Sequence, residues 1–239
     1  MAAAISDWLS FWDGPHCIYV GPRHRDAHYR LIAEQMAALV TAPDARVLDY
    51  GSGEALHADI VAAAAGELLL SDGAPRVRAG LAARFGGHAK IRALAPEDVE
   101  RLPDHCLDLI VLHSVAQYLT LAQAKNLLAL FRRLLQPRGT LVVSDVIPPH
   151  VGAATDAATL LRFAQREGFL LAALAGLART AFSDYRRLRS RFGLTHYSEA
   201  AMRELLAGAG FAAVRAEKNL GHNQARLAFI ARPAEAGSP

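Results

Sequence analysis

One short stretch of the chain has the composition of a ligand-binding turn. Residues 46–50 read as a strand, and Gly51, Ser52 and Gly53 follow it directly. Glycine adopts positive φ at little cost and lets a ligand approach the backbone closely. Apolar residues then recur at helical spacing over residues 54–65. A strand, a glycine turn and a helix in this order predict backbone N–H groups that are free to point at a bound ligand; a plain connection without a ligand is the alternative.

Two carboxylates near this turn could hold a nucleoside. Asp49 lies within the first predicted strand, and Asp72 ends the apolar run 67–72. Asp72 follows the glycine turn by about twenty residues, which is the spacing expected in nucleoside-binding α/β domains. A carboxylate at the end of a second parallel strand can accept hydrogen bonds from both ribose hydroxyls. Gly73 belongs to the same predicted site and leads into a helix over residues 75–85. A turn or N-cap role is the alternative for Asp72.

Two cofactor classes use this geometry, and one residue separates them. The dinucleotide fingerprint needs a small third residue so that helix and strand pack closely, whereas the bulky Leu56 stands there. Asp49-x-Gly51-x-Gly53 instead resembles the acidic-x-G-x-G motif of class I S-adenosylmethionine-dependent methyltransferases, with Ala55 at the family's common third glycine. The resemblance implies that the cofactor is S-adenosylmethionine, that the acid helps to bind its amino-acid end, and that the glycines let it lie against the backbone.

A second stretch carries the same resemblance. Residues 98–103, Asp-Val-Glu-Arg-Leu-Pro, resemble the D-A-E-x-L-P stretch common in these methyltransferases. The resemblance implies that Asp98 accepts a hydrogen bond from the adenine amino group and that the backbone of Val99 meets the ring. An N-capping role for Asp98 at the start of a short helical turn is the alternative.

The ends of two further predicted strands face the same ligand. Residues 106–113 are almost continuously apolar, which is typical of a strand buried on both faces. His113 and Ser114 end it beside the first strand, where ligands bind in open α/β sheets, and the resemblance places them at the methionine part of the cofactor. Tyr118 follows in a Ser-Val-x-Gln-Tyr pattern similar to that of several small-molecule methyltransferases. Asp145 ends the next strand. His113, Tyr118 and Asp145 are therefore the candidate catalytic residues, with helix packing as the alternative for Tyr118.

Composition excludes several classes of protein. The chain has 239 residues, which suits one large domain, and a formal net charge of only +3, which does not mark a nucleic-acid binder. Its two cysteines, Cys17 and Cys106, form no C-x-x-C pair, so neither a disulfide framework nor a zinc site is expected and a reducing cytoplasm fits. No apolar stretch reaches the roughly 18–20 residues that span a bilayer. The excess of arginine over lysine indicates a GC-rich bacterial genome.

The resemblance implies that the N-terminal 40 residues fold over the cofactor. An irregular aromatic segment precedes a predicted helix over residues 24–40. Tyr19, Arg23, His24 and His28 are candidate pocket residues, and anchoring of the segment to the domain is their alternative role.

Two later segments could also reach the cleft. Residues 151–197 read as a helical cap insertion of two or three helices, and it contains the basic run 184–191. That run could be a solvated helix face, a cap whose arginines attract an anionic substrate, or a lipid-facing surface. Asn219 to Asn223 form a predicted polar hairpin in which His222 could reach the cleft, a turn role being the alternative.

Together these observations predict a single α/β domain over residues 1–239. The resemblance implies a doubly wound, seven-stranded, mostly parallel sheet whose last strand is antiparallel. It also implies methyl transfer to an O, N or C nucleophile of a small-molecule acceptor by alignment and desolvation, without a metal. A nucleic-acid or lipid methyltransferase, a non-catalytic cofactor-binding partner protein and a nicotinamide-dependent oxidoreductase are the alternatives. The acceptor and the oligomeric state are not encoded in any motif that we can interpret.

Overall fold

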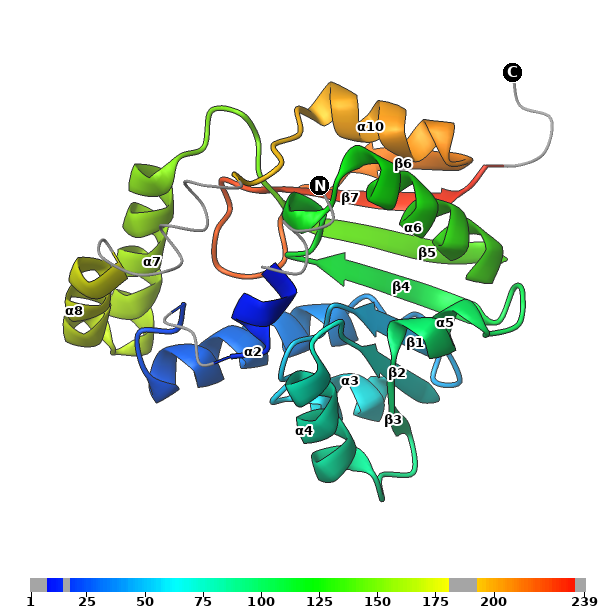
Figure 1. Ribbon diagram of the computed structural model, residues 1–239, viewed down its shortest axis with the longest axis horizontal. Coiled ribbons are helices and arrows are strands. Elements are labelled where there is room, and N and C mark those ends of the chain that lie inside the picture. Colours follow the sequence, from blue (N-terminus) through cyan, green and yellow to red (C-terminus); the bar gives the residue numbers. More distant parts are fainter. Residues whose placement is uncertain (1–7, 15–17, 181–192, 235–239) are drawn as a thin grey trace.

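A seven-stranded sheet forms the centre of the molecule. A computed structural model describes residues 8–14, 18–180 and 193–234. The strand order is β3-β2-β1-β4-β5-β7-β6, and β7 runs antiparallel to both of its neighbours while the other pairs are parallel. This confirms the predicted fold class (Figure 1). The strands are β1 Arg46–Tyr50, β2 Glu67–Ser71, β3 Ile91–Leu94, β4 Leu107–His113, β5 Leu135–Val146, β6 Phe211–Arg215 and β7 Leu227–Pro233.

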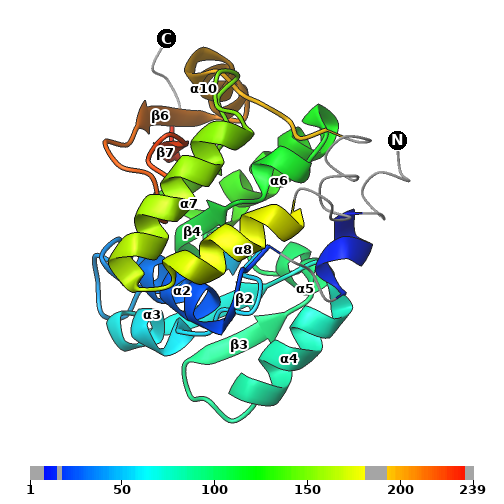
Figure 2. The same cartoon turned by 90° about the vertical axis from the view of Figure 1, so that its left-hand side faces the viewer.

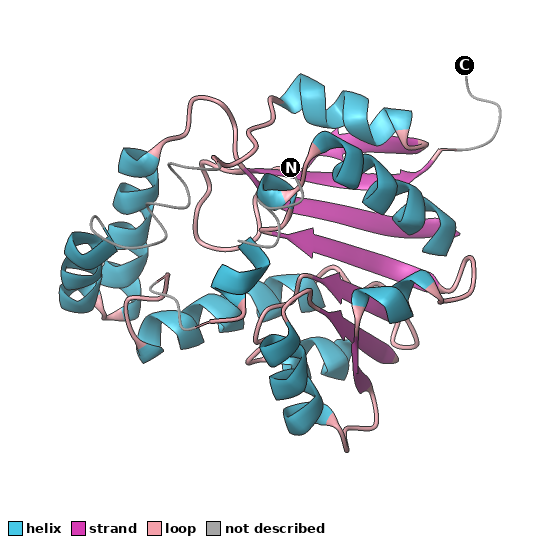
Figure 3. Ribbon diagram, in the orientation of Figure 1, coloured by secondary structure: helices cyan, strands magenta, loops and turns pink. Residues whose placement is uncertain are grey.

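Helices cover both faces of this sheet (Figure 3). One apolar cluster joins α5, α6 and α10 to one face of the strands, and a second joins α2, α3 and α4 to the other face. Alternate residues of a strand serve the two clusters: Leu48 and Ile110 lie in the first, Val47 and Leu109 in the second. Burial on both faces explains why these strands read as continuous apolar runs. The helices are α2 Pro22–Ala37, α3 Ala58–Ala64, α4 Pro75–Phe85, α5 Pro96–Glu100, the 3₁₀ turn η1 Ala116–Tyr118, α6 Leu121–Leu134, α7 Ala153–Glu167, α8 Leu170–Thr180 and α10 Glu199–Gly208.

Local signals explain most of the helix ends. The Ser198 hydroxyl accepts a hydrogen bond of 3.1 Å from the backbone N–H of Ala201, which confirms Ser198 as the N-cap of α10. Proline opens α4 at the predicted position, where its missing N–H costs no helical bond. The helix after the glycine turn differs from its prediction, since α3 begins only at Ala58. Ala55 has a φ of 41°, a left-handed conformation that an α-helix cannot include.

Two other elements differ from expectation. Residues 8–12 are helical, although the prolines and glycines around them predicted an irregular segment. Strand β5 starts at Leu135 rather than at Thr140, because Leu135 pairs with Leu107 of β4 before a break in register. Neither difference alters the sheet order.

Helices α7 and α8 lie beyond the carboxyl ends of the parallel strands, to the left of β4 in Figure 1 and in front of the sheet in Figure 2. A third apolar cluster, which includes Phe163, Phe169 and Ala173, joins them to Ala27 and Leu31 of α2. The basic run 184–191 lies outside the described residues. No helix in the described part of the chain is long and apolar enough to cross a membrane.

Candidate active site

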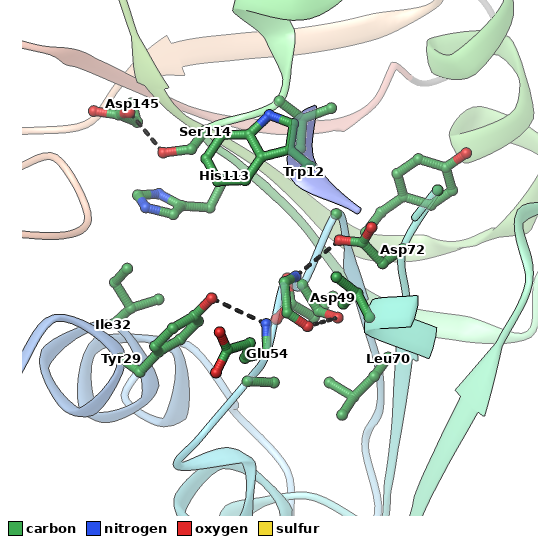
Figure 4. Close-up of a pocket in the computed structure, with 18 of the residues that line it drawn as sticks. Trp12, Tyr29, Ile32, Asp49, Glu54, Leu70, Asp72, His113, Ser114 and Asp145 are labelled. Atoms are coloured by element: carbon green, nitrogen blue, oxygen red, sulfur yellow. Dashed lines mark hydrogen bonds between the residues drawn. The ribbon is translucent and has the colours of Figure 1, made fainter. Parts of the chain in front are cut away.

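A cavity of about 860 Å³ lies at the carboxyl ends of the central strands, between the sheet, α2 and the N-terminal residues 8–14. Its volume is at the upper end of the roughly 300–1,000 Å³ typical of small-molecule sites. The structure brings most of the predicted site residues together here (Figure 4). The predicted residues that line it are Asp49, Gly51, Ser52, Gly53, Asp72, Gly73, His113, Ser114, Tyr118 and Asp145.

The glycine turn has the strained backbone that its sequence predicts. Gly51 and Gly53 have φ values of 81° and 56°. A Cβ on Gly51 would lie 2.2 Å from Cγ2 of Val115, and a Cβ on Gly53 would lie 2.6 Å from the Tyr29 hydroxyl. Both positions therefore require glycine for conformational and steric reasons.

The N–H groups of this turn, however, are not free. Those of Gly51 and Ser52 donate to the carbonyl oxygen of Ser71 at 2.7 and 3.0 Å. The Gly53 N–H donates to Oδ2 of Asp72 at 2.9 Å, and the Glu54 N–H donates to the Tyr29 hydroxyl at 3.0 Å. Sequence analysis expected free N–H groups, because a strand-to-helix turn often presents them. Here these N–H groups donate to Ser71, to Asp72 and to Tyr29 of α2. The turn therefore presents carboxylates and Cα–H groups to the cavity.

Asp72 connects the glycine turn to the start of α4 through its carboxylate. Besides the bond to Gly53, its Oδ1 accepts from the Ala74 N–H at 2.8 Å. Burial raises the pKa of Asp72, and the two backbone N–H donors oppose that rise. Each carboxylate oxygen has two lone-pair sites, so both can accept a further hydrogen bond from a ligand hydroxyl.

Asp49 is the most perturbed acid of the site. It is 8% exposed, and within the described residues no hydrogen bond reaches its carboxyl group. Burial, followed by the negative charge of Asp72, raises the pKa of Asp49 from 3.8 to about 7. A buried carboxyl group without a partner is costly, and a cation placed beside it would remove most of that cost.

Asp98 and Val99 do not line the cavity. The Asp98 carboxylate accepts from the Ala95 N–H at 3.0 Å in a capping arrangement and pairs with Arg101. Val99, on the buried side of α5, is fully buried in the core. Their predicted contacts with an adenine ring stay a prediction.

The ends of β4 and β5 form the opposite wall of the cavity. Ser114 and Asp145 follow the paired residues His113 and Ser144, and both adopt left-handed backbone conformations with φ values of 57° and 59°. The Ser114 hydroxyl donates to Oδ2 of Asp145 at 2.6 Å, and His113 Nδ1 lies 2.9 Å from the Ser144 hydroxyl. Left-handed conformations cost roughly 1–3 kcal/mol at residues other than glycine and are concentrated at functional sites.

Aromatic residues close the cavity. Tyr118 packs against Trp8 and Trp12, with ring centroids 4.8 and 5.8 Å apart. Of the four N-terminal candidates, Tyr19, His24 and His28 line the cavity, as does His222 from the loop between β6 and β7. Arg23 does not; its guanidinium instead lies against Gly168 at the end of α7.

Sequence analysis missed Tyr29 and Glu54. Tyr29 lies one helical turn before the cavity-lining residues Ile32 and Ala33, so the spacing of the apolar face of α2 could have indicated it. Glu54 directly follows the glycine turn, and its carboxylate lies 3.4 Å from Arg25. No group of three or more His, Cys, Asp or Glu side chains in the described ranges is arranged to hold a metal ion.

Comparisons with known proteins agree with this geometry. Residues 48–143 match a family model described as a methyltransferase domain. The fold is similar to that of DhpI in its complex with SAH, with 15% identity over 99% of this chain and 100% of that one and a TM-score of 0.63. It is also similar to magnesium protoporphyrin IX methyltransferase from Synechocystis PCC 6803 with bound SAH, with 16% identity over 98% and 95% of the two chains and a TM-score of 0.59.

A third similar structure is larger than this chain. The pyocyanin biosynthetic protein PhzM shares 15% identity, and the match covers 86% of this chain, with a TM-score of 0.57. The matched part spans 55% of the length of PhzM. Identities this low establish the fold alone. No curated protein sequence matches the chain significantly.

Proposed function

Because residues 48–143 match a methyltransferase domain, we propose that this chain is a class I S-adenosylmethionine-dependent methyltransferase that methylates a small-molecule acceptor inside the cavity. S-adenosylmethionine carries its methyl group on a positively charged sulfur and is therefore already activated. The protein has to align the acceptor with that methyl group and to exclude water.

The charge at the glycine turn supports this cofactor over a dinucleotide. A pyrophosphate needs free N–H donors at a helix N-terminus, but all four N–H groups of residues 51–54 are already engaged. Asp49 instead offers a buried carboxyl group without a partner, and Asp72 adds a second carboxylate. This pair suits a ligand with an ammonium group, a sulfonium group and ribose hydroxyls. The unpartnered Asp49 beside the saturated turn is the observation that carries the proposal.

The enclosure of the site supports a small acceptor. The cavity is bordered by the sheet, by α2 and by the aromatic residues Trp8 and Trp12, whereas a nucleic acid would need an open basic face. Among similar structures, one is named as a methyltransferase of magnesium protoporphyrin IX and another as a pyocyanin biosynthetic protein, and both names refer to small molecules. An anionic acceptor was one of three interpretations of the basic run 184–191, which lies outside the described residues.

The two sides of the cavity would bind different parts of the reactants. Asp49 and the glycine turn hold the amino-acid end of the cofactor, and Asp72 holds its ribose. His113, Ser114 and Asp145 lie opposite, where the acceptor would meet the methyl group. The half-buried, free thiol of Cys106 supports a reducing, cytoplasmic setting.

Calorimetry with S-adenosylhomocysteine tests the cofactor. We expect saturable binding to the wild-type protein and none with NAD. Asp72→Ala should weaken binding at least tenfold, because two ribose hydroxyls lose a charged acceptor. Asp44→Ala is the matched control, since Asp44 is exposed and remote from the cavity. Equal affinities for wild type and Asp72→Ala would contradict the assignment.

A labelling experiment tests the acceptor class. The protein is incubated with methyl-tritiated S-adenosylmethionine and a bacterial extract, and the products are separated by ultrafiltration. We expect the transferred label in the small-molecule filtrate, on a product that is distinct from unreacted S-adenosylmethionine. Label that stays with nucleic acid, protein or lipid would refute the small-molecule proposal while leaving methyl transfer intact.

A further inference from the structure

Four histidines from three separate parts of the chain meet at one end of the cavity. His24 and His28 come from α2, His113 ends β4, and His222 lies in the loop between β6 and β7. The ring centroid of His28 lies 6.3 Å from that of His24 and 6.4 Å from those of both His113 and His222. We call these four residues the imidazole cluster. The group is not a metal site in this arrangement.

Two members of the imidazole cluster have structural partners. His24 stacks on Phe169 with centroids 5.0 Å apart, and its Nδ1 accepts from the Val20 N–H at 3.3 Å. His113 contacts the Ser144 hydroxyl through Nδ1. Across the described ranges, by contrast, neither nitrogen of His28 or His222 makes a hydrogen bond to the protein. An enclosed polar group left unpaired is costly, so a ligand that pairs with these rings would remove that cost.

The ring of His222 is nevertheless held in place. Phe163 stacks on it with centroids 4.6 Å apart and an interplanar angle of 11°. On either side of it, the Gly221 N–H donates to Gln35 at 2.6 Å and the Asn223 side chain donates to Asp156 at 2.9 Å. These bonds tie the loop to α2 and α7. A clamped imidazole with unpaired nitrogens in a cavity is arranged to meet a ligand.

Carboxylates near His222 partly offset the effect of burial on the pKa of its ring. Burial lowers the pKa of His222, so the ring is neutral at neutral pH, and the Asp145 carboxylate acts in the opposite direction. Asp156 also favours the charged ring, while Arg166 and His113 oppose it; His24 and His28 face the ring from α2. A neutral base with a carboxylate nearby can take a proton and be stabilised as it does so.

We propose that His222 is the general base of the reaction and that the acceptor is a planar aromatic hydroxyl compound. This inference rests on the proposed methyl transfer in the same cavity. The hydroxyl proton moves to the unpaired nitrogen of His222 as an oxygen lone pair forms the bond to the methyl carbon. The carbon–sulfur bond breaks with its electron pair going to sulfur, which becomes a neutral thioether. The imidazolium then releases its proton to solvent.

The surroundings of the imidazole cluster select this acceptor class. Tyr19 lies beside His28 and, together with Tyr118, gives the cavity aromatic walls, and such walls favour a planar ring. Neutral imidazoles accept hydrogen bonds from a hydroxyl group but offer no cation to a carboxylate or phosphate. A phenolic hydroxyl is protonated at neutral pH, so its methylation gains from a base.

Two acceptors that differ in ionisation test the base. Methyl transfer from tritiated S-adenosylmethionine is measured with 1-naphthol, which is protonated at pH 7.5, and with 2,4-dinitro-1-naphthol, which is ionised. We expect His222→Gln to slow transfer to 1-naphthol by about 100-fold or more and to leave transfer to the ionised acceptor nearly unchanged. The rate of the wild type with 1-naphthol should be level through neutral pH, where His222 is already neutral, whereas that of His222→Gln should rise with pH as the acceptor itself ionises.

His24→Gln is the matched control, because it changes a cluster histidine whose partners are structural. This variant should have a lower melting temperature, and it should slow methyl transfer to both acceptors by the same factor. If His222→Gln slowed methyl transfer to both acceptors by the same factor, the base assignment would be overturned. If the wild-type protein bound S-adenosylhomocysteine but transferred no methyl group to either acceptor, the acceptor class would be overturned. Absence of S-adenosylhomocysteine binding would instead refute the proposed function itself.

Discussion

Replacement of Asp49 by asparagine should make the free protein more stable and the cofactor site weaker. The pKa of Asp49 rises from 3.8 to about 7 on folding, first because of burial and then because of Asp72. The folded state therefore binds the proton more tightly than the unfolded chain does. Stability must fall as the pH rises from 3.8 to about 7 and must stay at the lower level above that.

The size of the effect follows from the same shift. One pKa unit corresponds to about 1.4 kcal/mol, so the Asp49 carboxylate costs the folded state roughly 4 kcal/mol at pH 8 and much less at pH 5. The asparagine side chain of the variant would carry no charge at either pH. The stability gap between Asp49→Asn and wild type should therefore widen by ~2.5 kcal/mol between pH 5 and pH 8, or on the order of 5–10 °C in melting temperature.

Thermal unfolding of both proteins across this pH range is the assay. Asp44→Asn is the control, because Asp44 is exposed and its neutralisation should give no comparable pH-dependent gap. A gap between Asp49→Asn and wild type that is the same at pH 5 and pH 8 would refute the claim that folding buries an uncompensated acid here.

The same variant should lose cofactor affinity. A cationic ligand favours ionised Asp49, so the wild type must release a proton to bind below pH 7. Its affinity for S-adenosylmethionine should fall about fivefold between pH 7 and pH 6, and calorimetry should show proton release. Asp49→Asn should bind weakly with little pH dependence in this range. Tight binding by the variant would show that the carboxylate does not contact the cofactor.

Three further changes have defined outcomes. Ser198→Ala should cost about 1 kcal/mol in urea unfolding because α10 loses its N-cap, and a loss below a few tenths would contradict that role. Gly51→Ala should destabilise the protein by roughly 1–3 kcal/mol through its positive φ alone, with a further loss from the clash with Val115; unchanged unfolding and S-adenosylhomocysteine binding would disprove the steric argument. Tyr29→Phe should leave the Glu54 N–H unpaired and weaken S-adenosylhomocysteine binding several-fold in calorimetry, whereas unchanged affinity would show that the turn holds its shape without this bond.

Much of the fold is encoded locally. The apolar run before Gly51 and the glycines themselves predict β1 and its turn, because strand burial and positive φ depend on neighbouring residues. Proline at the start of α4 and serine before α10 predict helix starts for the same reason. The motif around Asp49 predicted a methyltransferase, and residues 48–143 match a methyltransferase domain. Local rules failed at Ala55, whose left-handed backbone delays the start of α3.

The properties of the site depend on contacts between distant residues. The N–H groups of the glycine turn are engaged by Ser71, Asp72 and Tyr29. Asp72 and Tyr29 lie 19 and 25 positions along the chain from the N–H groups that they bind, so no local pattern shows that these groups are taken. The imidazole cluster likewise joins His28 to His222. Sequence alone determined which residue types could bind a charged nucleoside, since motifs record spacing. Tertiary structure alone decided which of these groups are buried, paired or left open to a ligand, because desolvation and hydrogen bonding depend on what the folded chain places around each side chain.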